Sequence, residues 1–459
     1  MDTVAQVSTA LEEVLIRAAD RAAWLTGFVQ RDSKLTGSAF VQTLVLGYLH
    51  EPQASFSHLA GTAAQLGVAI TAQGLYQRFG ATAAACLLQV LGAAARQVVL
   101  AEPTLVPLLL RFRAVWIQDS TTLTLPATLR AVWEGCGGGT AAGTTAAVKL
   151  QVQFDLCRGA LRGPELHAGR TGDQEGALVD TAEPGSLQVR DLGYFSLERF
   201  RAWSAAAVYW LSRVKAGTYV ADARSRACTT PAYLRARGPV LDQPVQVGRA
   251  APLEARLIAV RVPPKVAQER RRKLRAEAKR EGQTPSAVRL GWADWTLLLT
   301  NLPPEQLSVD EALALAGARW QIELLFKLWK AERRLCVWHN TKAAFVLCEV
   351  YAKLLGVLVQ HWLLLIACWH VPERSLTKAA RVLRGHLGVL LGALRGRWSL
   401  PEAVEQLTDG LAASARMTAR RRYPNTYQRL RDPTLPWLFR ERRPARPGRK
   451  PTTTRRKVA

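Results

Sequence analysis

The stretch "GARWQIELLFKLWKAERRL", residues 317–335, has the apolar spacing of a helix and carries three charged residues along one side of it. At about 100° per residue, Glu323 and Lys330 fall within about 40° of Arg319 around the helix axis. The residues expected to face a core lie on the remaining arc: Trp320, Ile322, Leu324, Leu325, Leu328 and Trp329. The charged stripe is either an i,i+4 ion pair on the surface, worth about 0.2–0.5 kcal/mol, or part of a functional site.

Two other carboxylates favour the second interpretation. Asp119 ends the apolar run "AVWIQD" and Asp191 ends "SLQVRD". An acid at the end of a buried strand costs desolvation unless a cation or hydrogen-bond donors meet it. Three carboxylates without a set of His or Cys ligands are the hard oxygen donors that Mg²⁺ prefers. Two ions about 3.5–4 Å apart at Asp119, Asp191 and Glu323 could activate a water or a 3′-hydroxyl against a phosphodiester.

The composition predicts a folded chain with a polyanionic partner. The 459 residues are 49% hydrophobic, and 62 Lys and Arg against 36 Asp and Glu give a net charge of +26. Eight basic residues lie in 265–281 and nine in 440–459. Each run alone could be a solvated helix face or a disordered tail, but together with the global charge they favour nucleic acid.

The remaining composition excludes several classes. Seven scattered cysteines without CxxC spacing argue against a disulfide framework or a zinc site and fit a reducing cytoplasm. The N-terminus lacks the features of a secretory signal. The longest apolar run, residues 354–369, is short for a bilayer span and contains Gln360 and His361, so it predicts a buried core helix.

Residues 1–105 have helical periodicity without strand-like alternation. Within them, residues 55–79 predict two helices that are broken at Gly67, the second starting near Thr71 and ending in Gln77 and Arg78. This is helix-turn-helix spacing, and the second helix could enter a major groove of DNA. Any two packed helices joined by a glycine turn look similar.

From about residue 106 to 221 short β-branched runs alternate with helical segments, notably 196–215, and predict a mixed α/β domain. The glycine cluster 135–145 predicts a flexible connection. Residues 222–300 read as an insertion with Pro-rich pieces, a basic helix and the strand "WADWTLLLTNLP". Helices resume from Val309 to about Ala415, and the basic tail 438–459 is expected to be disordered.

With these motifs in order, the chain resembles the DDE transposases of bacterial insertion sequences, of the IS-four type. The family signature Tyr-x2-Arg-x3-Glu-x6-Lys is matched by Arg319, Glu323 and Lys330, with Ala316 at the tyrosine position. "DSTTLTLP" and "DLGYF" match the contexts of the first and second family aspartates. Residues 34–52, "KLTGSAFVQTLVLGYLHEP", are also similar to the family's N-terminal region.

The resemblance implies an α/β, RNase H-like catalytic domain, formed by residues 106–221 and 301–345 and interrupted by the strand-rich insertion 222–300. An all-helical DNA-binding domain, 1–105, would precede it, and a helical region, 346–437, would follow. It also implies two Mg²⁺ ions, with Mn²⁺ as a substitute, held by Asp119, Asp191 and Glu323. The expected activity is cleavage and strand transfer at terminal inverted repeats, through a hairpin end.

The expected partners are double-stranded DNA, at the element ends and the target, and a second copy of the chain in a synaptic dimer. We expect no membrane, no small-molecule substrate, and a place at the bacterial nucleoid. Trp295 could stack a flipped base, like its neighbour Trp292, or be an ordinary core residue, and Asp173 could have a supporting role. The remaining residues expected to contact DNA are Arg319, Lys330, Arg213, Gln77, Arg78, Arg271, Arg272 and Lys273.

Two rival functions share these features. The first is a decayed or repurposed copy that acts as a DNA-binding repressor. The intact triad argues against it, because a repressor does not need three convergent carboxylates. The second rival is a nuclease of the same fold that cleaves without strand transfer. The helix-turn-helix candidate and the pair Arg319 and Lys330 favour recognition of specific DNA ends instead.

Overall fold

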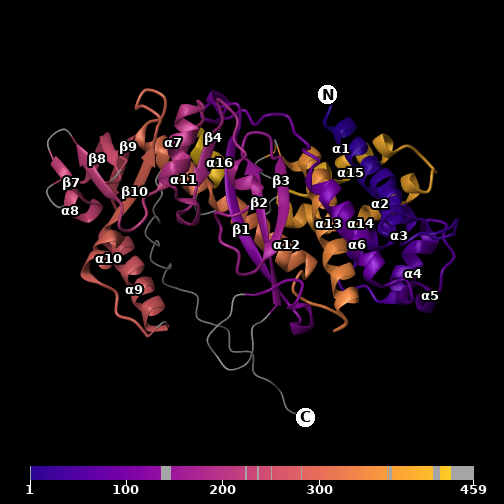
Figure 1. The fold of residues 1–459 in the computed structure, drawn as a ribbon. Helices are drawn as coiled ribbons and strands as arrows, with labels where there is room; N and C mark the ends of the chain where they lie inside the picture. The colour runs from indigo at the N-terminus through magenta and orange to yellow at the C-terminus, as the bar shows by residue number, and fades with distance from the viewer. Residues whose placement is uncertain are drawn as a thin grey trace, which may run out of the picture.

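The chain is a mixed α/β protein, as predicted: N-terminal helices, a central ten-stranded mixed sheet and C-terminal helices (Figure 1). The computed structural model describes residues 2–135, 146–222, 225–234, 237–249, 251–280, 282–369, 371, 375–416 and 424–435. The glycine-rich residues 136–145 and the tail 438–459 lie outside the described residues.

The first 95 residues are helical, as expected from their periodicity. Hydroxyl side chains of Thr36, Ser55 and Thr71 cap the starts of three of the helices by accepting a backbone N–H. The helices are α1 (Thr3–Glu12), a π-helical turn (Glu13–Ala18), α2 (Ala19–Leu25), α3 (Gly37–His50), α4 (Phe56–Gln65), α5 (Ala72–Tyr76) and α6 (Ala81–Ala95).

The helix-turn-helix segment 55–79 consists of α4, a turn at Gly67 and the short α5. Gly67 has φ +88°, a conformation that favours glycine. The second helix spans only five residues and stops at Tyr76, and Gln77 and Arg78 follow it in the turn before α6, with exposed side chains. Contact of α5 with a major groove stays a prediction.

The central sheet has the strand order β3-β2-β1-β4-β5-β10-β9-β8-β6-β7. β4 pairs parallel with β1 and with β5, and the other neighbours are antiparallel. The first five strands are β1 (Val115–Leu125), β2 (Ala146–Asp155), β3 (Leu161–Ala168), β4 (Leu187–Arg190) and β5 (Tyr209–Arg213). The three parallel strands β1, β4 and β5 therefore lie inside the sheet, with β2 beside β1 and β10 beside β5.

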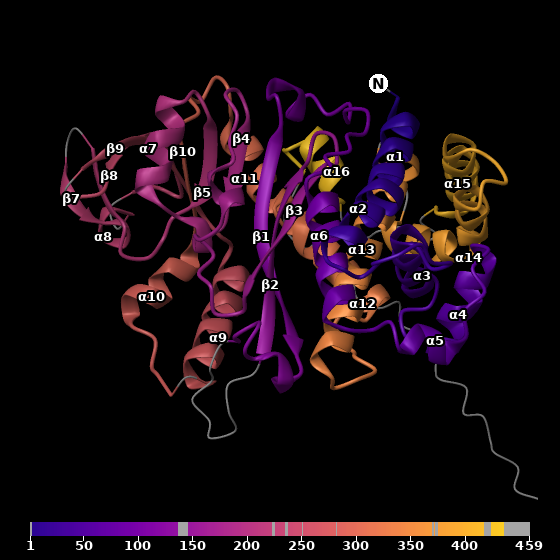
Figure 2. The same ribbon diagram turned by 45° about the vertical axis from the view of Figure 1, so that its right-hand side comes forward.

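The other five strands extend the same sheet (Figure 2). β6 (Tyr219–Asp222) begins before the predicted insertion 222–300, and the elements that follow it lie within the insertion. They are β7 (Ser225–Thr229), α8 (Thr230–Leu234), β8 (Val240–Val247), β9 (Leu253–Arg261), α9 (Pro264–Arg280), α10 (Ala287–Gly291) and β10 (Trp295–Thr300). The expected helix 196–215 is wrong in its second half: α7 (Leu197–Ala205) ends, and β5 follows. Leu211 and Ser212 of β5 pair with β4 on one side and β10 on the other, and these long-range bonds override local helix propensity.

The C-terminal helices are α11 (Val309–Ala318), α12 (Trp320–Arg333), α13 (Ala343–Cys368), α14 (Leu376–Leu394), α15 (Leu400–Ser414) and α16 (Thr426–Arg431). α13 is long and apolar enough to cross a membrane by length and composition, but its most apolar window is entirely buried inside the structure. The prediction of a buried core helix is therefore confirmed. α13 contacts α3 and α6 of the N-terminal region, so both helical regions share one core.

Candidate active site

Helix α12 presents Arg319, Glu323 and Lys330 toward β1, and it buries a narrower face than expected. Ile322, Leu325, Phe326 and Trp329 are buried at i, i+3, i+4 and i+7. Trp320 and Leu324, which were predicted to face the core, are 47% and 44% exposed. The prediction was wrong for these two because α12 packs against β1, α13 and α14, and Trp320 and Leu324 lie on the arc that these elements leave open.

The strand pairing places the two aspartates side by side. In the parallel ladder Ile117 of β1 is level with Val189 of β4, so Asp119 and Asp191 each follow two residues further in the same direction. Side chains alternate between the two faces of a sheet. Asp119 and Asp191 therefore lie on one face, and the preceding residues, Gln118 and Arg190, lie on the other. Asp191 lies at the carboxyl end of β4, where open α/β sheets commonly form their sites.

Three carboxylates meet at one guanidinium. Arg319 lies 3.0 Å from Asp119 Oδ2, 3.2 Å from Asp191 Oδ2 and 2.9 Å from Glu323 Oε1. All four side chains are largely buried, with exposed fractions between 14% and 29%. The acids expected to act together are therefore brought together from β1, the end of β4 and α12, and the i,i+4 ion pair is one part of this larger cluster.

The cluster holds more negative than positive charge. Burial first, and then the neighbouring Asp191 and Glu323, raise the pKa of Asp119 to about 6, against the lowering effects of the Ser120 N–H and Arg319. Asp191 Oδ1 is buried without a hydrogen-bond donor, and Arg213 Nη1 is the cation 3.9 Å from it. A buried carboxylate oxygen without a donor is available to a further cation.

The three carboxylates are donors that fit a divalent metal, and Arg319 occupies the space between them. No three His, Cys, Asp or Glu side chains in the described ranges surround a common point that could hold an ion. Among Asp119, Asp191 and Glu323, the guanidinium of Arg319 stands between the carboxylates. Oxygen-only donors, excess negative charge and the unpaired Asp191 Oδ1 are nevertheless the chemistry of a Mg²⁺ site.

The raised pKa of Asp119 predicts an acidic limit of activity near pH 6. If Asp119 ligates a metal for DNA cleavage, as the resemblance implies, cleavage should fall as the pH drops through about 6, because a protonated carboxyl group is a poor metal ligand. More Mg²⁺ should move this limit to lower pH, since metal and proton compete. The measurement is the initial cleavage rate against pH at two Mg²⁺ concentrations, with DNA binding as the control. An acidic limit near pH 4 that does not shift with Mg²⁺ concentration would contradict the assignment of Asp119 as a metal ligand.

Asp173 lies against the segments that follow the two aspartates. Its Oδ1 accepts hydrogen bonds from Ser120 Oγ at 2.9 Å and from Lys149 Nζ at 3.0 Å. A Cβ on Gly193 would lie only 2.8 Å from Asp173 Oδ2, so a side chain at position 193 would displace the Asp173 carboxylate. This placement is consistent with the expected supporting role, which stays a prediction.

The other two cations of the predicted site also lie beside β1 and β5. Lys330 Nζ donates to the carbonyl of Thr122 at 3.0 Å, three residues after Asp119. Arg213, at the end of β5, is 55% exposed in its side chain. A small cavity of about 10 Å³ beside Ala316 is also lined by Arg213 and Arg319, and it lies where the family signature has tyrosine.

The remaining predicted DNA contacts lie elsewhere. Trp295 is half-buried against the hydrophobic cluster around Phe200 and Trp210, and the Arg261 guanidinium lies 5.1 Å from its ring centre. Stacking of a base on Trp295 stays a prediction. On α9, Arg271 pairs with Asp294, and Arg272 pairs with Glu269 at 2.8 Å. Lys273 is exposed, as are Gln77 and Arg78.

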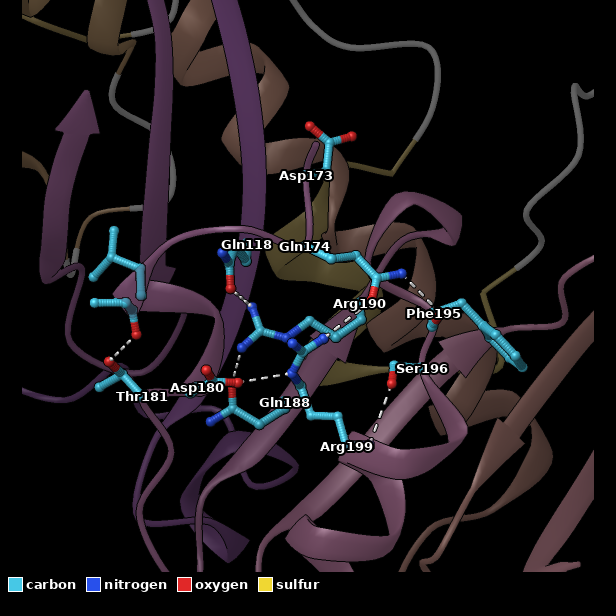
Figure 3. Close-up of polar contacts among 12 residues, drawn as sticks. Gln118, Asp173, Gln174, Asp180, Thr181, Gln188, Arg190, Phe195, Ser196 and Arg199 are labelled. Carbon is cyan, nitrogen blue, oxygen red and sulfur yellow. Dashed lines mark hydrogen bonds and ion pairs between the residues drawn. The ribbon is translucent and has the colours of Figure 1, made fainter. Parts of the chain in front are cut away.

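Sequence reasoning missed a buried polar layer on the other face of the sheet (Figure 3). Gln118, Gln151, Gln153, Gln188 and Arg190 are each at most 1% exposed. Burial lowers the pKa of Arg190 to about 9. The signal was present in "WIQD" and "LQVRD", where strongly polar residues occupy strand positions that should be apolar.

The sequence is similar to known transposases along most of its length. The family described as "Transposase DDE domain" matches residues 111–352, more than half of the chain. A transposase for insertion sequence element IS231B from Bacillus thuringiensis is 26% identical over 433 residues, covering 86% of this chain and 88% of the relative. A transposase for IS1151 from Clostridium perfringens is 22% identical over 54% of this chain and 56% of its own. A putative transposase of IS186A from Escherichia coli is 36% identical over 106 residues, 23% of this chain and 29% of its own.

Proposed function

Because this chain belongs to the insertion-sequence transposases with a DDE domain, which are phosphoryl-transfer enzymes acting on DNA, we propose that Asp119, Asp191 and Glu323 form its catalytic site. We further propose an RNase H-like core with the domain boundaries given above. The protein would bind the terminal inverted repeats of its element as a dimer, and move the element by cut and paste through a hairpin end.

The convergence of the three carboxylates on Arg319 is the observation that supports the proposal most. Positions 119, 191 and 323 are far apart in sequence, yet their oxygens lie within 3.2 Å of one guanidinium. A structural ion pair needs only one carboxylate for one guanidinium, and the two further acids cost desolvation. Such an excess of buried negative charge is typical of a site that holds a cation.

These carboxylates would hold the divalent metal that DDE transposases use, and we propose that it is a pair of Mg²⁺ ions. Such a pair would activate the attacking oxygen and stabilise the leaving oxygen of the phosphodiester. The chain's own cations would hold the DNA backbone next to them. Lys330 needs to release only one carbonyl bond, to Thr122, in order to contact a phosphate. Arg319 would exchange one or more carboxylates for a phosphate oxygen, as charge-assisted hydrogen bonds permit.

A joining assay tests the proposed function. The purified protein, Mg²⁺ and a DNA fragment with one element end should yield a nick at the end, and the 3′-hydroxyl formed should then join to a target plasmid. Fragments with a scrambled repeat provide the control. Cleavage without joining would favour a plain nuclease, and binding without cleavage would favour a repressor. Either result would overturn the transposition mechanism proposed here.

Arg319 would compete with a metal for the same carboxylate oxygens, so its removal should strengthen metal binding and still reduce cleavage. Arg319→Met should bind Mn²⁺ about tenfold more tightly, because one positive charge in contact with three carboxylates is removed. Cleavage should still fall, because a phosphate contact is lost. Free Mn²⁺ is measured by electron paramagnetic resonance, with Arg199→Met, which contacts Asp180 instead, as the control. Weaker Mn²⁺ binding by Arg319→Met would contradict the competition.

The basic helix α9 should supply phosphate contacts through its exposed residues. Lys273, Arg275, Lys279 and Arg280 are exposed, and α9 projects beyond the strands of the insertion (Figures 1 and 2). Replacing all four by Gln should reduce the slope of log K against log salt by about 3–4, since each phosphate contact contributes about 0.9.

The matched control for α9 is Arg113→Gln with Arg170→Gln, because both arginines are exposed, pair with Glu183 and Glu134, and lie outside the expected DNA-binding domain 1–105. Fluorescence anisotropy with a labelled duplex at four salt concentrations gives both slopes. The control should leave the slope unchanged. An unchanged slope in the α9 variant as well would exclude α9 from the DNA interface.

A further inference from the structure

Arg190 is the most unusual buried residue outside the carboxylate cluster. It ends β4, directly before Asp191, and its side chain is 1% exposed. Within the described part of the chain no carboxylate forms an ion pair with its guanidinium. Asp180, an acid close enough to influence it, is paired with Arg199 at 3.0 Å and is 75% exposed in its side chain (Figure 3).

The partners of Arg190 are neutral. Its guanidinium donates to Gln118 Oε1 and, at 2.7 Å, to Gln188 Oε1, while its Nε is buried without a hydrogen-bond acceptor. The ring of Trp203 lies 5.1 Å from the guanidinium carbon. Burying a charge with only neutral partners costs free energy, and a neutral side chain could fill the same space. Stability alone therefore does not account for an arginine at this position.

The two glutamines show what the guanidinium connects. Gln118 lies on β1 directly before Asp119, and Gln188 lies on β4 with Arg190 itself. Since the two strands are parallel and Ile117 is level with Val189, the bond from Arg190 to Gln118 joins them at the residue before each aspartate. Arginine is suited to this bridge, because its planar fork fixes two acceptors at a set spacing and orientation.

We propose that Arg190 is a positioning residue that fixes the spacing and register of β1 and β4, so that Asp119 and Asp191 face one point together with Glu323. The guanidinium acts from the opposite face of the sheet and touches neither substrate nor metal. The inference rests on the proposed metal site at these carboxylates. A small slip between the strands would separate the two carboxylates, whereas it would leave the packed helices and the basic DNA-binding surfaces in place.

Mn²⁺ binding by the full chain, measured by electron paramagnetic resonance without DNA, tests this role. Arg190→Met should weaken Mn²⁺ binding at least about tenfold, as expected for partners that orient metal ligands, while metal-free DNA affinity changes by less than about twofold. Arg256→Met is the matched control. Arg256 is also buried, at 6% exposure, but it contacts Asp242 and the carbonyls of Leu302 and Leu307. It should lose stability in urea without losing Mn²⁺ affinity.

Unchanged Mn²⁺ affinity in folded Arg190→Met would overturn the proposal, and so would equal weakening in Arg256→Met, which would indicate a general loss of stability. If Arg190→Met does not fold, Gln118→Leu replaces it, because this variant removes the bond to β1 and keeps the charge. A tenfold loss then supports the role, and no loss refutes it. Asp119→Asn separates the two proposals: if it binds Mn²⁺ like the wild type, the proposed metal site itself fails.

Discussion

Asp119→Asn and Glu323→Gln should each reduce cleavage of element-end DNA by about 10²–10³-fold, comparable to losing one preorganised electrostatic group in other enzymes. Each change is nearly isosteric and removes one negative charge from the cluster around Arg319. The fold should persist, because an amide can still accept a hydrogen bond from the guanidinium. DNA affinity should be equal or slightly higher, since less negative charge then faces the phosphates.

The experiment compares single-turnover cleavage with DNA affinity measured in the absence of metal. Asp180→Asn is the matched control, because Asp180 is an acid of the 3₁₀ turn Ala177–Asp180 before β4 and pairs with Arg199 instead of Arg319. It should cleave like the wild type. Comparable cleavage by the wild type and the two cluster variants would falsify the catalytic assignment and leave a basic DNA-binding protein.

Lys353→Met should lower the free energy of unfolding by about 3–5 kcal/mol, the usual cost of removing one partner from a buried ion pair. Lys353 Nζ lies 2.7 Å from Glu349 Oε1 on α13, and the two side chains are 1% and 4% exposed. Burial lowers the pKa of Lys353, and the nearby Glu349 opposes this effect. Without the lysine, the donors left for the buried Glu349 carboxylate in the described part of the chain are the backbone N–H and ring Nδ1 of His339.

The effect should extend to the segment after α12. Lys353 Nζ also donates to the Val337 carbonyl at 3.0 Å, and the Trp338 indole donates to the Thr124 carbonyl of β1 at 3.2 Å. The ion pair therefore anchors the connection from α12 to α13 beside the strand that carries Asp119.

Urea unfolding measures the loss of stability caused by Lys353→Met. The double variant Glu349→Gln with Lys353→Met should recover much of the stability, because no unpaired charge stays buried. Arg17→Ala, at an ion pair whose side chains are 63% and 45% exposed, should cost less than about 1 kcal/mol. Equal losses for Lys353→Met and Arg17→Ala would show that the buried pair is not specially stabilising.

The sequence by itself determined the helical N-terminal region, the α/β class and the motifs that carry Asp119, Asp191 and Glu323. The charged stripe of α12 could be read because helical periodicity is local. The resemblance to the family identified Asp119, Asp191 and Glu323 as one group, which the periodicity of any single segment could not do. These features depend on neighbours within a few residues, so they can be predicted from the sequence.

Only the tertiary structure decided how those motifs meet. It placed one guanidinium among three carboxylates and buried Arg190 between the end of β4 and the middle of β1. It also exposed Trp320 and Leu324 and made Tyr209–Arg213 a strand. Each of these outcomes depends on partners far away in the sequence. Burial and strand pairing are set by what packs against a segment, and local pattern does not encode that partner.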